Sequence, residues 1–310
     1  NVTVASLTSI NSGQILQIEG ARVRNMSATT AGTLTVGTDG TSSEFDGTFS
    51  DGAAAPFGLT KVGAGTLTLT GNNTNTGPVI VNGGTIALTG SGSFNEATAL
   101  AVATGAALDV SGRSDGTLTL NANQTLKHIG VSTGPISITG NVNLGSGTLL
   151  LGINHAGLAH DSLAASGSIT YNGTLAVTNT GAALQAGDSF QLFPAGATGF
   201  AAFSLPTNDI INNVKYTWAN TVGSDGKITV STVSPLVNTN PPQIQVSVSG
   251  STFNLGWPTN AGWTLLTNSV GLAATNQWFP YPNSANVTNE SIPMDPTKAN
   301  VFFKLQYPYP

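Results

Sequence analysis

Apolar and polar residues alternate in short runs along the first three quarters of the chain, and the clearest runs begin with glycine and threonine. Alternation with a period of two places every second side chain on the same face of a β-strand. The recurring unit is Gly-Thr-apolar-x-apolar. It occurs as Gly32-Thr-Leu-Thr-Val36, Gly65-Thr-Leu-Thr-Leu69, Gly84-Thr-Ile-Ala-Leu88, Gly116-Thr-Leu-Thr-Leu120, Gly147-Thr-Leu-Leu-Leu151 and Gly173-Thr-Leu-Ala-Val177. The pattern therefore predicts a series of short strands, each with one apolar face.

The spacing of these units decides between two ways of pairing the strands. The intervals between their first glycines are irregular, and they are typical of solenoid repeats rather than of hairpins. Hairpins favour two-residue turns, whereas these intervals leave room for about three short strands in each repeat, as in a coil. The pattern therefore favours a parallel β-solenoid. At about 20 residues per turn, residues 1–234 predict on the order of eleven turns, stacked over about 50 Å.

The pattern changes near residue 235. Residues 235–242 read Pro-Leu-Val-Asn-Thr-Asn-Pro-Pro, a composition typical of a stiff linker. After the linker, short apolar runs separated by Gly, Pro and Asn predict the strands of a small β-sandwich-like module over residues 243–310. These runs cover residues 244–248, 253–257, 263–266, 277–279 and 301–305. The chain is thus predicted to be all-β, with a solenoid domain over residues 1–234.

The composition supports an all-β protein that works outside the cell. Charged residues make up only 7% of the chain, against about 25% in a typical soluble domain. Long solvated helices need Lys and Glu on their outer faces, so this composition disfavours them. A hydrophobic content of 39% with a net charge of −5 still supports collapse to a folded state. The chain has no cysteine, which rules out disulfides and thiolate sites.

The charge distribution argues against two classes of partner. Nucleic-acid binding needs a clustered cationic face, but the nine Lys and Arg residues are scattered, apart from Arg22 and Arg24. The charge-free stretch between Lys61 and Glu96 is interrupted by Thr, Asn and Gly, so we expect no membrane span. The first residues lack the basic and apolar regions of a signal peptide, and we therefore expect an exported protein whose signal peptide has been removed.

One segment carries a family resemblance. Residues 57–94 contain Gly58-Leu-Thr-Lys-Val-Gly63, then Gly65-Thr-Leu-Thr-Leu-Thr-Gly-Asn-Asn-Thr74, then Asn82-Gly-Gly-Thr-Ile-Ala-Leu88. This order resembles the autotransporter-associated β-strand repeat of bacterial passenger domains, with Asn75 where the family often has Tyr and Gly77-Pro78 in place of a Gly-Gly turn. The resemblance implies a passenger-type solenoid, a scaffold that carries no particular chemistry.

The later segments resemble parts of other surface proteins. Residues 161–203, with Asp161-Ser-Leu-Ala-Ala165 and Leu184-Gln-Ala-Gly-Asp188, are similar to the segment that closes the solenoid in repeat-bearing surface proteins of Verrucomicrobia-like bacteria. The motifs Ser-Gly-x-x-Phe-x-Leu-x-Trp-Pro at residues 249–258 and Val-Phe-Phe-Lys-Leu at 301–305 resemble the terminal module of the same proteins. These resemblances imply a secreted surface protein and say nothing about its chemistry.

Two motifs with a catalytic or metal-binding interpretation are weak. Residues 130–134 match the G-x-S-x-G string of serine hydrolases, but that mechanism needs a helix after Ser132, and the sequence after Pro135 is strand-like. His155 and His160 with Asp161 offer metal ligands, yet their spacing suits neither one helix face nor one strand face. We therefore expect turn and loop roles for these residues.

Two groups of acidic residues raise further alternatives. The cluster of Asp39, Glu44, Asp46 and Asp51 offers oxygen ligands for calcium, although the nonapeptide of calcium-binding β-rolls is missing and the Asp-Gly pairs are turn signals. Asp109 and Asp115 are the nearest carboxylate pair in the repeat region, with Arg113 between them. Polysaccharide cleavage needs such a pair, but the flanking glycines indicate a turn. We expect no cofactor and no metal.

The chain ends offer two contact surfaces. The first ten residues alternate without charge or proline, which suits a strand that either seals its own first turn or pairs with a neighbouring molecule. The residues assigned to such assembly are Val2, Val4, Leu7 and Ile10. Aromatic residues near the other end are candidates for stacking on glycans, namely Trp257, Trp263, Trp278 and Tyr281, though at least two of the Trp are expected in the core.

The sequence as a whole predicts a secreted, noncatalytic structural or adhesive surface protein. Its expected partner is a second copy of itself, joined end to end into fibres, or a surface glycan. The alternative function is a glycan-binding or polysaccharide-cleaving solenoid.

Overall fold

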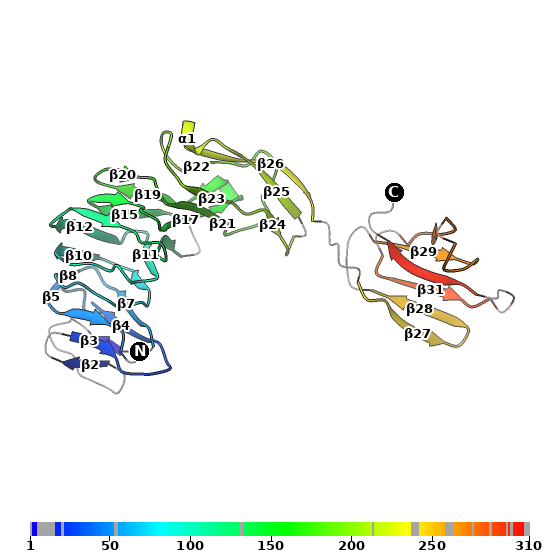
Figure 1. Ribbon diagram of the computed structural model, residues 1–310, viewed down its shortest axis with the longest axis horizontal. Coiled ribbons are helices and arrows are strands. Elements are labelled where there is room, and N and C mark those ends of the chain that lie inside the picture. The colour runs from blue at the N-terminus through cyan, green and yellow to red at the C-terminus, as the bar shows by residue number, and fades with distance from the viewer. Residues whose placement is uncertain are drawn as a thin grey trace. The chain divides into compact units, whose positions relative to one another are not determined.

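The computed structural model describes residues 2–4, 16–19, 22–52, 55–130, 133–212, 214–236, 242–257, 263–274, 276–284, 287–295, 297 and 300–306. These residues form two compact units, Asn1–Pro235 and Leu236–Pro310. The first unit is a β-solenoid and the second a small antiparallel β-module (Figure 1). The predicted fold class is confirmed. No helix in the described ranges has the length and hydropathy needed to cross a bilayer.

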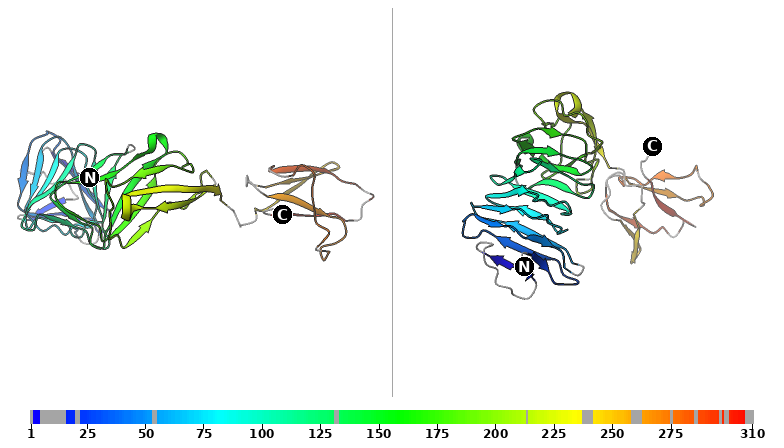
Figure 2. Two further views of the ribbon diagram at one scale, coloured as in Figure 1. Left: turned by 90° about the horizontal axis from the view of Figure 1, so that it is seen from above. Right: turned by 60° about the vertical axis from the view of Figure 1, so that its left-hand side comes forward.

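The solenoid winds through three faces in each turn, and strands of successive turns pair in parallel (Figure 2). The first face comprises β1 (Val2–Val4), β4 (Gly32–Val36), β7 (Phe57–Lys61), β9 (Val79–Val81), β11 (Ala99–Ala103), β14 (Thr125–Ile129), β17 (Thr148–Asn154), β21 (Thr174–Asn179) and β23 (Ala202–Ser204). The second face comprises β5 (Ser43–Phe45), β8 (Thr66–Leu69), β10 (Thr85–Gly90), β12 (Ala107–Arg113), β15 (Pro135–Thr139) and β19 (Ser162–Ala165).

The third face is built in two separate parts. Near the N-terminus it contains β3 (Arg22–Asn25) and β6 (Thr48–Ser50), which pair in parallel, and β2 (Leu16–Glu19), which pairs with β3 in antiparallel. Further along it contains β13 (Thr117–Thr119), β16 (Asn141–Asn143) and β20 (Ile169–Thr170). Between the two parts, isolated bridges pair Ser50 with Thr74 and Asn72 with Ser93. The third face is therefore less regular than the other two.

The first face stacks apolar side chains in register. One inward row runs through Leu34, Leu59, Val79, Leu100, Leu126, Leu149 and Leu175 before it reaches Phe203. Every member of this row up to Leu175 is at most 2% exposed. Such a row is the column of apolar contacts that a solenoid needs, because a single turn cannot bury its own apolar face.

The turns are longer and fewer than predicted. The turn that separates Leu59 from its partner Val79 has the predicted length. The turn between the partners Leu175 and Phe203 is longer, and so is the turn between Val2 and Leu34. The solenoid consequently has about seven turns rather than eleven. Turn length varies because the connections between the strands vary while the pairing of the strands is kept.

The Gly-Thr units occur on all three faces. The units that begin at Gly32, Gly147 and Gly173 form strands β4, β17 and β21 of the first face. Those at Gly65 and Gly84 form β8 and β10 of the second face, and the unit at Gly116 forms β13 of the third. The unit therefore marks a strand that follows a turn, not one position in each repeat, which explains its irregular spacing.

An antiparallel sheet follows the parallel stack within the first unit. It contains β22 (Ser189–Gln191), β26 (Lys227–Pro235), β25 (Val214–Asn220) and β24 (Asn208–Asp209), and the short helix α1 (Val222–Asp225) precedes β26. Phe190, Tyr216, Ile228 and Val230 of this sheet belong to the same buried cluster as the solenoid rows. The sheet thus packs onto the solenoid core and closes its C-terminal end, a feature that the repeat pattern does not predict.

The second unit is made of two three-stranded antiparallel sheets. One sheet contains β27 (Gln245–Ser249), β28 (Thr252–Gly256) and β31 (Asn289–Pro293), and the other contains β30 (Phe279–Pro280), β29 (Thr264–Asn268) and β32 (Phe302–Gln306). Five of these strands lie within or beside the predicted apolar runs, and the pattern does not predict β31. The core between the sheets is formed by Leu255, Trp257 and Leu265.

Candidate functional site

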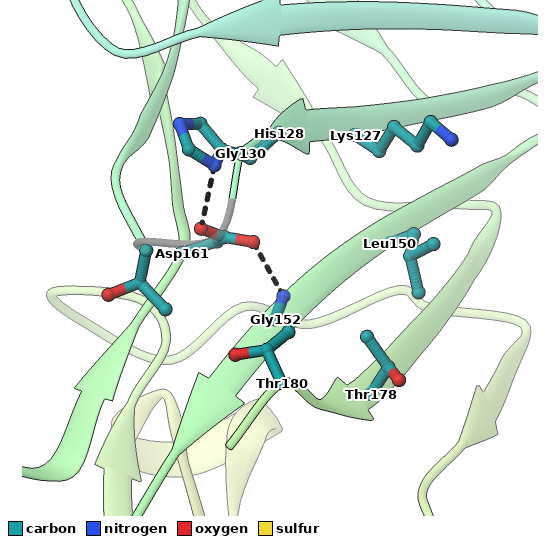
Figure 3. A pocket seen from close by; sticks show the side chains of 9 residues that line it. Lys127, His128, Gly130, Leu150, Gly152, Asp161, Thr178 and Thr180 are labelled. Atoms are coloured by element: carbon teal, nitrogen blue, oxygen red, sulfur yellow. Dashed lines mark hydrogen bonds and ion pairs between the residues drawn. The ribbon is translucent and has the colours of Figure 1, made fainter. Parts of the chain in front are cut away.

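Histidine and aspartate side chains gather where the chain leaves the regular solenoid path. Strand β17 runs on to Asn154, and a 3₁₀ turn η1 (Ala156–Leu158) leads into β18 (Ala159–His160), which pairs with β17 in antiparallel. Gly157 and Leu158 both have positive φ, 66° and 52°, so this turn reverses the chain sharply. The excursion brings Asp161 back over Gly152 (Figure 3).

The Asp161 side chain and backbone bond to Gly152 of β17, where β14 no longer pairs with that strand. Its Oδ2 accepts a hydrogen bond from the Gly152 amide at 2.6 Å, its Oδ1 accepts one from the Gly134 amide at 2.9 Å, and its own amide donates to the Gly152 carbonyl at 2.8 Å. A Cβ at residue 152 would lie 2.9 Å from Asp161 Oδ2, so only glycine fits without a shift. The buried carboxylate thus ties three segments of the chain together.

His128 links this carboxylate to the preceding turn. Its Nδ1 lies 3.3 Å from Asp161 Oδ1, and its Nε2 shares a hydrogen bond of 2.9 Å with Thr104 Oγ1. Only 3% of the His128 side chain and 9% of the Asp161 side chain are exposed. The Thr104 hydroxyl, the His128 imidazole and the Asp161 carboxylate are therefore connected in the order found in nucleophilic catalytic triads. None of the sequence motifs predicted that Thr104 and His128 would meet.

The surroundings of these three residues favour a structural role. The cavity beside His128 and Asp161 measures about 70 Å³ (Figure 3), whereas ligand pockets usually occupy roughly 300–1,000 Å³. A Cβ on Gly134 would lie 2.3 Å from Thr104 Oγ1, so the Gly134 backbone covers one side of the hydroxyl. The arrangement acts as a polar clamp across neighbouring turns.

The other two histidines have separate partners. His155 Nδ1 lies 2.8 Å from Asp188 Oδ2, and Asp188 also accepts a hydrogen bond from the Gln185 amide. His160 Nδ1 lies 3.0 Å from the Asp161 carbonyl oxygen. His155 and His160 thus contact different acceptors. Among the described residues, no three His, Asp or Glu side chains converge in a way that would hold a metal ion.

The acidic residues 39–51, all of them described, form no group of three or more side chains that could hold a metal ion. Asp39 accepts hydrogen bonds from the amide and hydroxyl of Thr41, which lower the pKa of its carboxyl. Asp51 accepts them from the Phe57 amide at 2.7 Å and from the Thr76 hydroxyl at 2.6 Å. These two residues stabilise turns. Glu44 and Asp46 are exposed.

The remaining candidates are placed as follows. Ser132, Leu7 and Ile10 lie outside the described residues. Val2 and Val4 belong to β1, which pairs with β4 of the same chain, Val2 with Leu34 and Val4 with Val36. Pairing of the N-terminal strand with a neighbouring molecule stays a prediction. Asp109 accepts hydrogen bonds from the amide and hydroxyl of Ser111, and Asp115 pairs with Arg113.

The four aromatic candidates of the second unit have different environments. Trp257 and Trp263 are 5% and 6% exposed and pack in the interior, so they offer no surface to a ligand. Trp278 is half-buried beneath Lys304, whose Nζ lies 4.6 Å from the ring centre. Tyr281 packs edge-on against Phe303.

A buried lysine is a feature that the sequence reasoning missed. Lys61 occupies an inward position between Val36 and Val81 on the first face and is 1% exposed. Its Nζ donates to the carbonyls of Val62, Gly63 and Gly83 at 2.6, 3.0 and 3.3 Å. The sequence signal is present in the Thr-Lys-Val-Gly string, where lysine interrupts the apolar alternation.

Comparison with known families identifies part of the solenoid. Residues 59–88 match the family model of the passenger-associated-transport-repeat. The matched segment runs from β7 to β10 and includes Lys61. No curated protein matches the sequence. The match supports the autotransporter passenger repeat inferred from residues 57–94, while the similarity of later segments to surface proteins of Verrucomicrobia-like bacteria stays a prediction.

Proposed function

We propose that this protein is an exported bacterial surface protein whose solenoid acts as a structural or adhesive scaffold. The observation that carries the proposal is the passenger repeat at residues 59–88, which lies within a stacked parallel solenoid. A scaffold outside the cell needs resistance to unfolding more than it needs a reactive site, and continuous buried rows such as the one through Leu59 and Leu126 supply that resistance. The proposed location is the cell surface or the extracellular medium.

Surface location can be tested on intact cells of the source bacterium. An antibody against the solenoid should label unpermeabilised cells or detect the protein in the culture medium, and a periplasmic protein should be labelled only after permeabilisation. Retention of the solenoid behind the outer membrane, with labelling only of permeabilised cells, would refute the proposal.

Self-association is the finer part of the proposal. At the N-terminal end of the solenoid, β1, β2 and β5 are edge strands of their sheets, and such edges pair readily with other strands. At the C-terminal end, the antiparallel sheet of β22, β26, β25 and β24 packs on the core. The N-terminal end is therefore the expected joint, and pairing of two such ends produces a dimer more readily than a fibre.

The association prediction is tested by removing residues 1–10. Light scattering and electron microscopy of the full chain should show concentration-dependent association that the truncated chain lacks. A full chain that stays monomeric at high concentration would contradict self-association, and a truncated chain that associates equally would contradict a joint through β1.

A further inference from the structure

The third face of the solenoid is interrupted between Ser93 and β13. Ser93 pairs with Asn72 of the preceding turn, and β13 pairs with β16 of the following turn. Within the described residues, no β-pairing connects Ser93 to β13, although the first and second faces are continuous at the same level through β11–β14 and β10–β12. The parallel pairing of strands is therefore interrupted on the third face only, and we call this gap between Ser93 and β13 the opening.

Long polar side chains bridge this opening where backbone pairing is missing. Gln124 Nε2 donates to the carbonyls of Phe94 and Ala97 at 2.6 and 3.0 Å. Asn121 Nδ2 donates to the Asn95 carbonyl at 2.9 Å. At the other end of the opening, Arg113 donates to the Gly92 carbonyl. These side chains satisfy backbone carbonyls that would otherwise pair with a neighbouring strand.

Two adjoining cavities lie in this opening. One measures about 210 Å³ and the other about 350 Å³, and both are lined by Asn95, Arg113 and Asp115. Their combined volume lies within the range of small-ligand sites, roughly 300–1,000 Å³. The first cavity is lined by polar residues and by Leu88, Phe94 and Leu118, which are at most 7% exposed. The second is lined by Asn, Ser, Gly, Arg and Asp.

The charges in the opening are already paired. Arg113 Nε lies 3.0 Å from Asp115 Oδ1, and the hydrogen bond from Arg113 holds the pKa of the Asp115 carboxyl below its usual value. The guanidinium also donates to the Gly92 carbonyl. A charged ligand would have to break this pair, so the opening suits a ligand that is polar and uncharged.

We propose that this opening, defined by Asn95, Arg113, Asp115, Thr119 and Asn121, binds a neutral carbohydrate chain. Sugars carry many hydroxyl groups, and the amide of Asn95, the hydroxyl of Thr119 and the carboxylate of Asp115 line the opening as groups that bond to hydroxyls. The ligand would extend from the first cavity across Arg113 into the second. This inference deepens the proposed surface role by naming the class of target, and it rests on that role.

The same observations argue against two other uses of the opening. An additional peptide strand would need the gap between Ser93 and β13 to be free, but Gln124 and Asn121 cross it. Cleavage of the carbohydrate would need two available carboxyl groups, whereas Asp109 is bound to Ser111 and Asp115 to Arg113. Binding without cleavage is therefore what the opening supports.

The test uses the purified full chain and three neutral hexasaccharides, namely cellohexaose, laminarihexaose and maltohexaose, with hexagalacturonate as the anionic comparison. Titration calorimetry and saturation-transfer NMR measure binding. Thr119→Trp places a large ring at the first cavity. The matched control is Thr170→Trp, because Thr119 pairs with Asn143 and Asn143 pairs with Thr170 in the same row.

We expect at least one neutral hexasaccharide to bind, with affinity reduced tenfold or more by Thr119→Trp and unchanged by Thr170→Trp. Ser114→Trp, at the second cavity, provides an independent blocking variant if Thr119→Trp does not fold. Absence of binding by all three neutral probes at millimolar concentration, equal binding by a folded blocking variant, or stronger binding of hexagalacturonate would overturn the proposal. Surface labelling of cells is a separate measurement, so failure of one proposal is distinguishable from failure of the other.

Discussion

Replacing the buried lysine of the passenger repeat should weaken the solenoid. Lys61→Met keeps a long aliphatic side chain but removes the three donors that bind the carbonyls of Val62, Gly63 and Gly83. A hydrogen bond to a charged group contributes about 1.5–3 kcal/mol, so three such bonds contribute about 4.5–9 kcal/mol. Burying the ammonium costs several kcal/mol, which methionine does not incur. The net loss on substitution is expected at about 2–4 kcal/mol.

The assay is urea unfolding followed by far-ultraviolet circular dichroism. Lys215→Met is the control, because Lys215 is exposed on β25 and a surface substitution changes the free energy of unfolding by about 0.5 kcal/mol or less. A Lys61→Met variant as stable as the wild type, or more stable, would show that the three carbonyls gain nothing from the ammonium and would refute the reasoning.

The pH dependence of the free energy of unfolding, compared between the wild type and Lys61→Met, provides a second measurement. Burial lowers the pKa of the Lys61 ammonium below its usual value of 10.5. Between the folded and unfolded pKa values the unfolded chain binds more protons, so the free energy of unfolding rises with pH in that window. The stability of the wild type relative to Lys61→Met should therefore increase as the pH is raised toward 10.5. A constant or shrinking difference would contradict a lowered pKa.

Two further substitutions test the packing and the polar clamp. Leu67→Asp buries an unpaired charge at a fully buried position of β8 and should abolish cooperative unfolding in urea. Thr66→Asp, on the outward side of the same strand, should leave cooperative unfolding intact. A folded Leu67→Asp protein would contradict the inward assignment of Leu67. Gly152→Ala brings a Cβ within 2.9 Å of Asp161 Oδ2 and should lower the free energy of unfolding by about 1–3 kcal/mol. Gly223→Ala is the control, because its Cβ meets no atom within 4 Å and should not destabilise the protein. Equal melting temperatures of the two variants would count against the polar clamp.

The strands of this protein are predictable because their signal is local. The period-two alternation in Gly65-Thr-Leu-Thr-Leu69 and its relatives contains the information for an extended segment with one buried face, and each unit does form a strand. The number of turns, in contrast, cannot be read from any short stretch of sequence. The turn from Leu59 to its partner Val79 is short and the turn from Val2 to its partner Leu34 is long, and only the three-dimensional stack shows which face each Gly-Thr unit occupies.

Polar residues inside the stack were harder to predict for the same reason. Lys61 and His128 belong to one inward row that runs through Val36, Val81 and Val102. Their partners lie on other turns, because Lys61 reaches the carbonyl of Gly83 and His128 reaches the carboxylate of Asp161. A sequence shows that a polar residue interrupts an apolar pattern, but the satisfaction of that residue depends on how the turns stack.

The repeat structure makes one deletion a strict test of the stacking. Thr66 of β8 pairs with Thr85 of β10, so removing residues 66–84 joins Gly65 to Thr85, restores the Gly-Thr-apolar-x-apolar unit and deletes one turn. Because each turn contacts only its neighbours, the shortened chain should fold, with a smaller dependence of the unfolding free energy on urea. Removing residues 68–85 instead joins Leu67 to Ile86, so two consecutive apolar residues cannot both face inward. That variant should aggregate or melt far lower, and equal folding of the two deletions would mean that the register of the stack does not determine the fold.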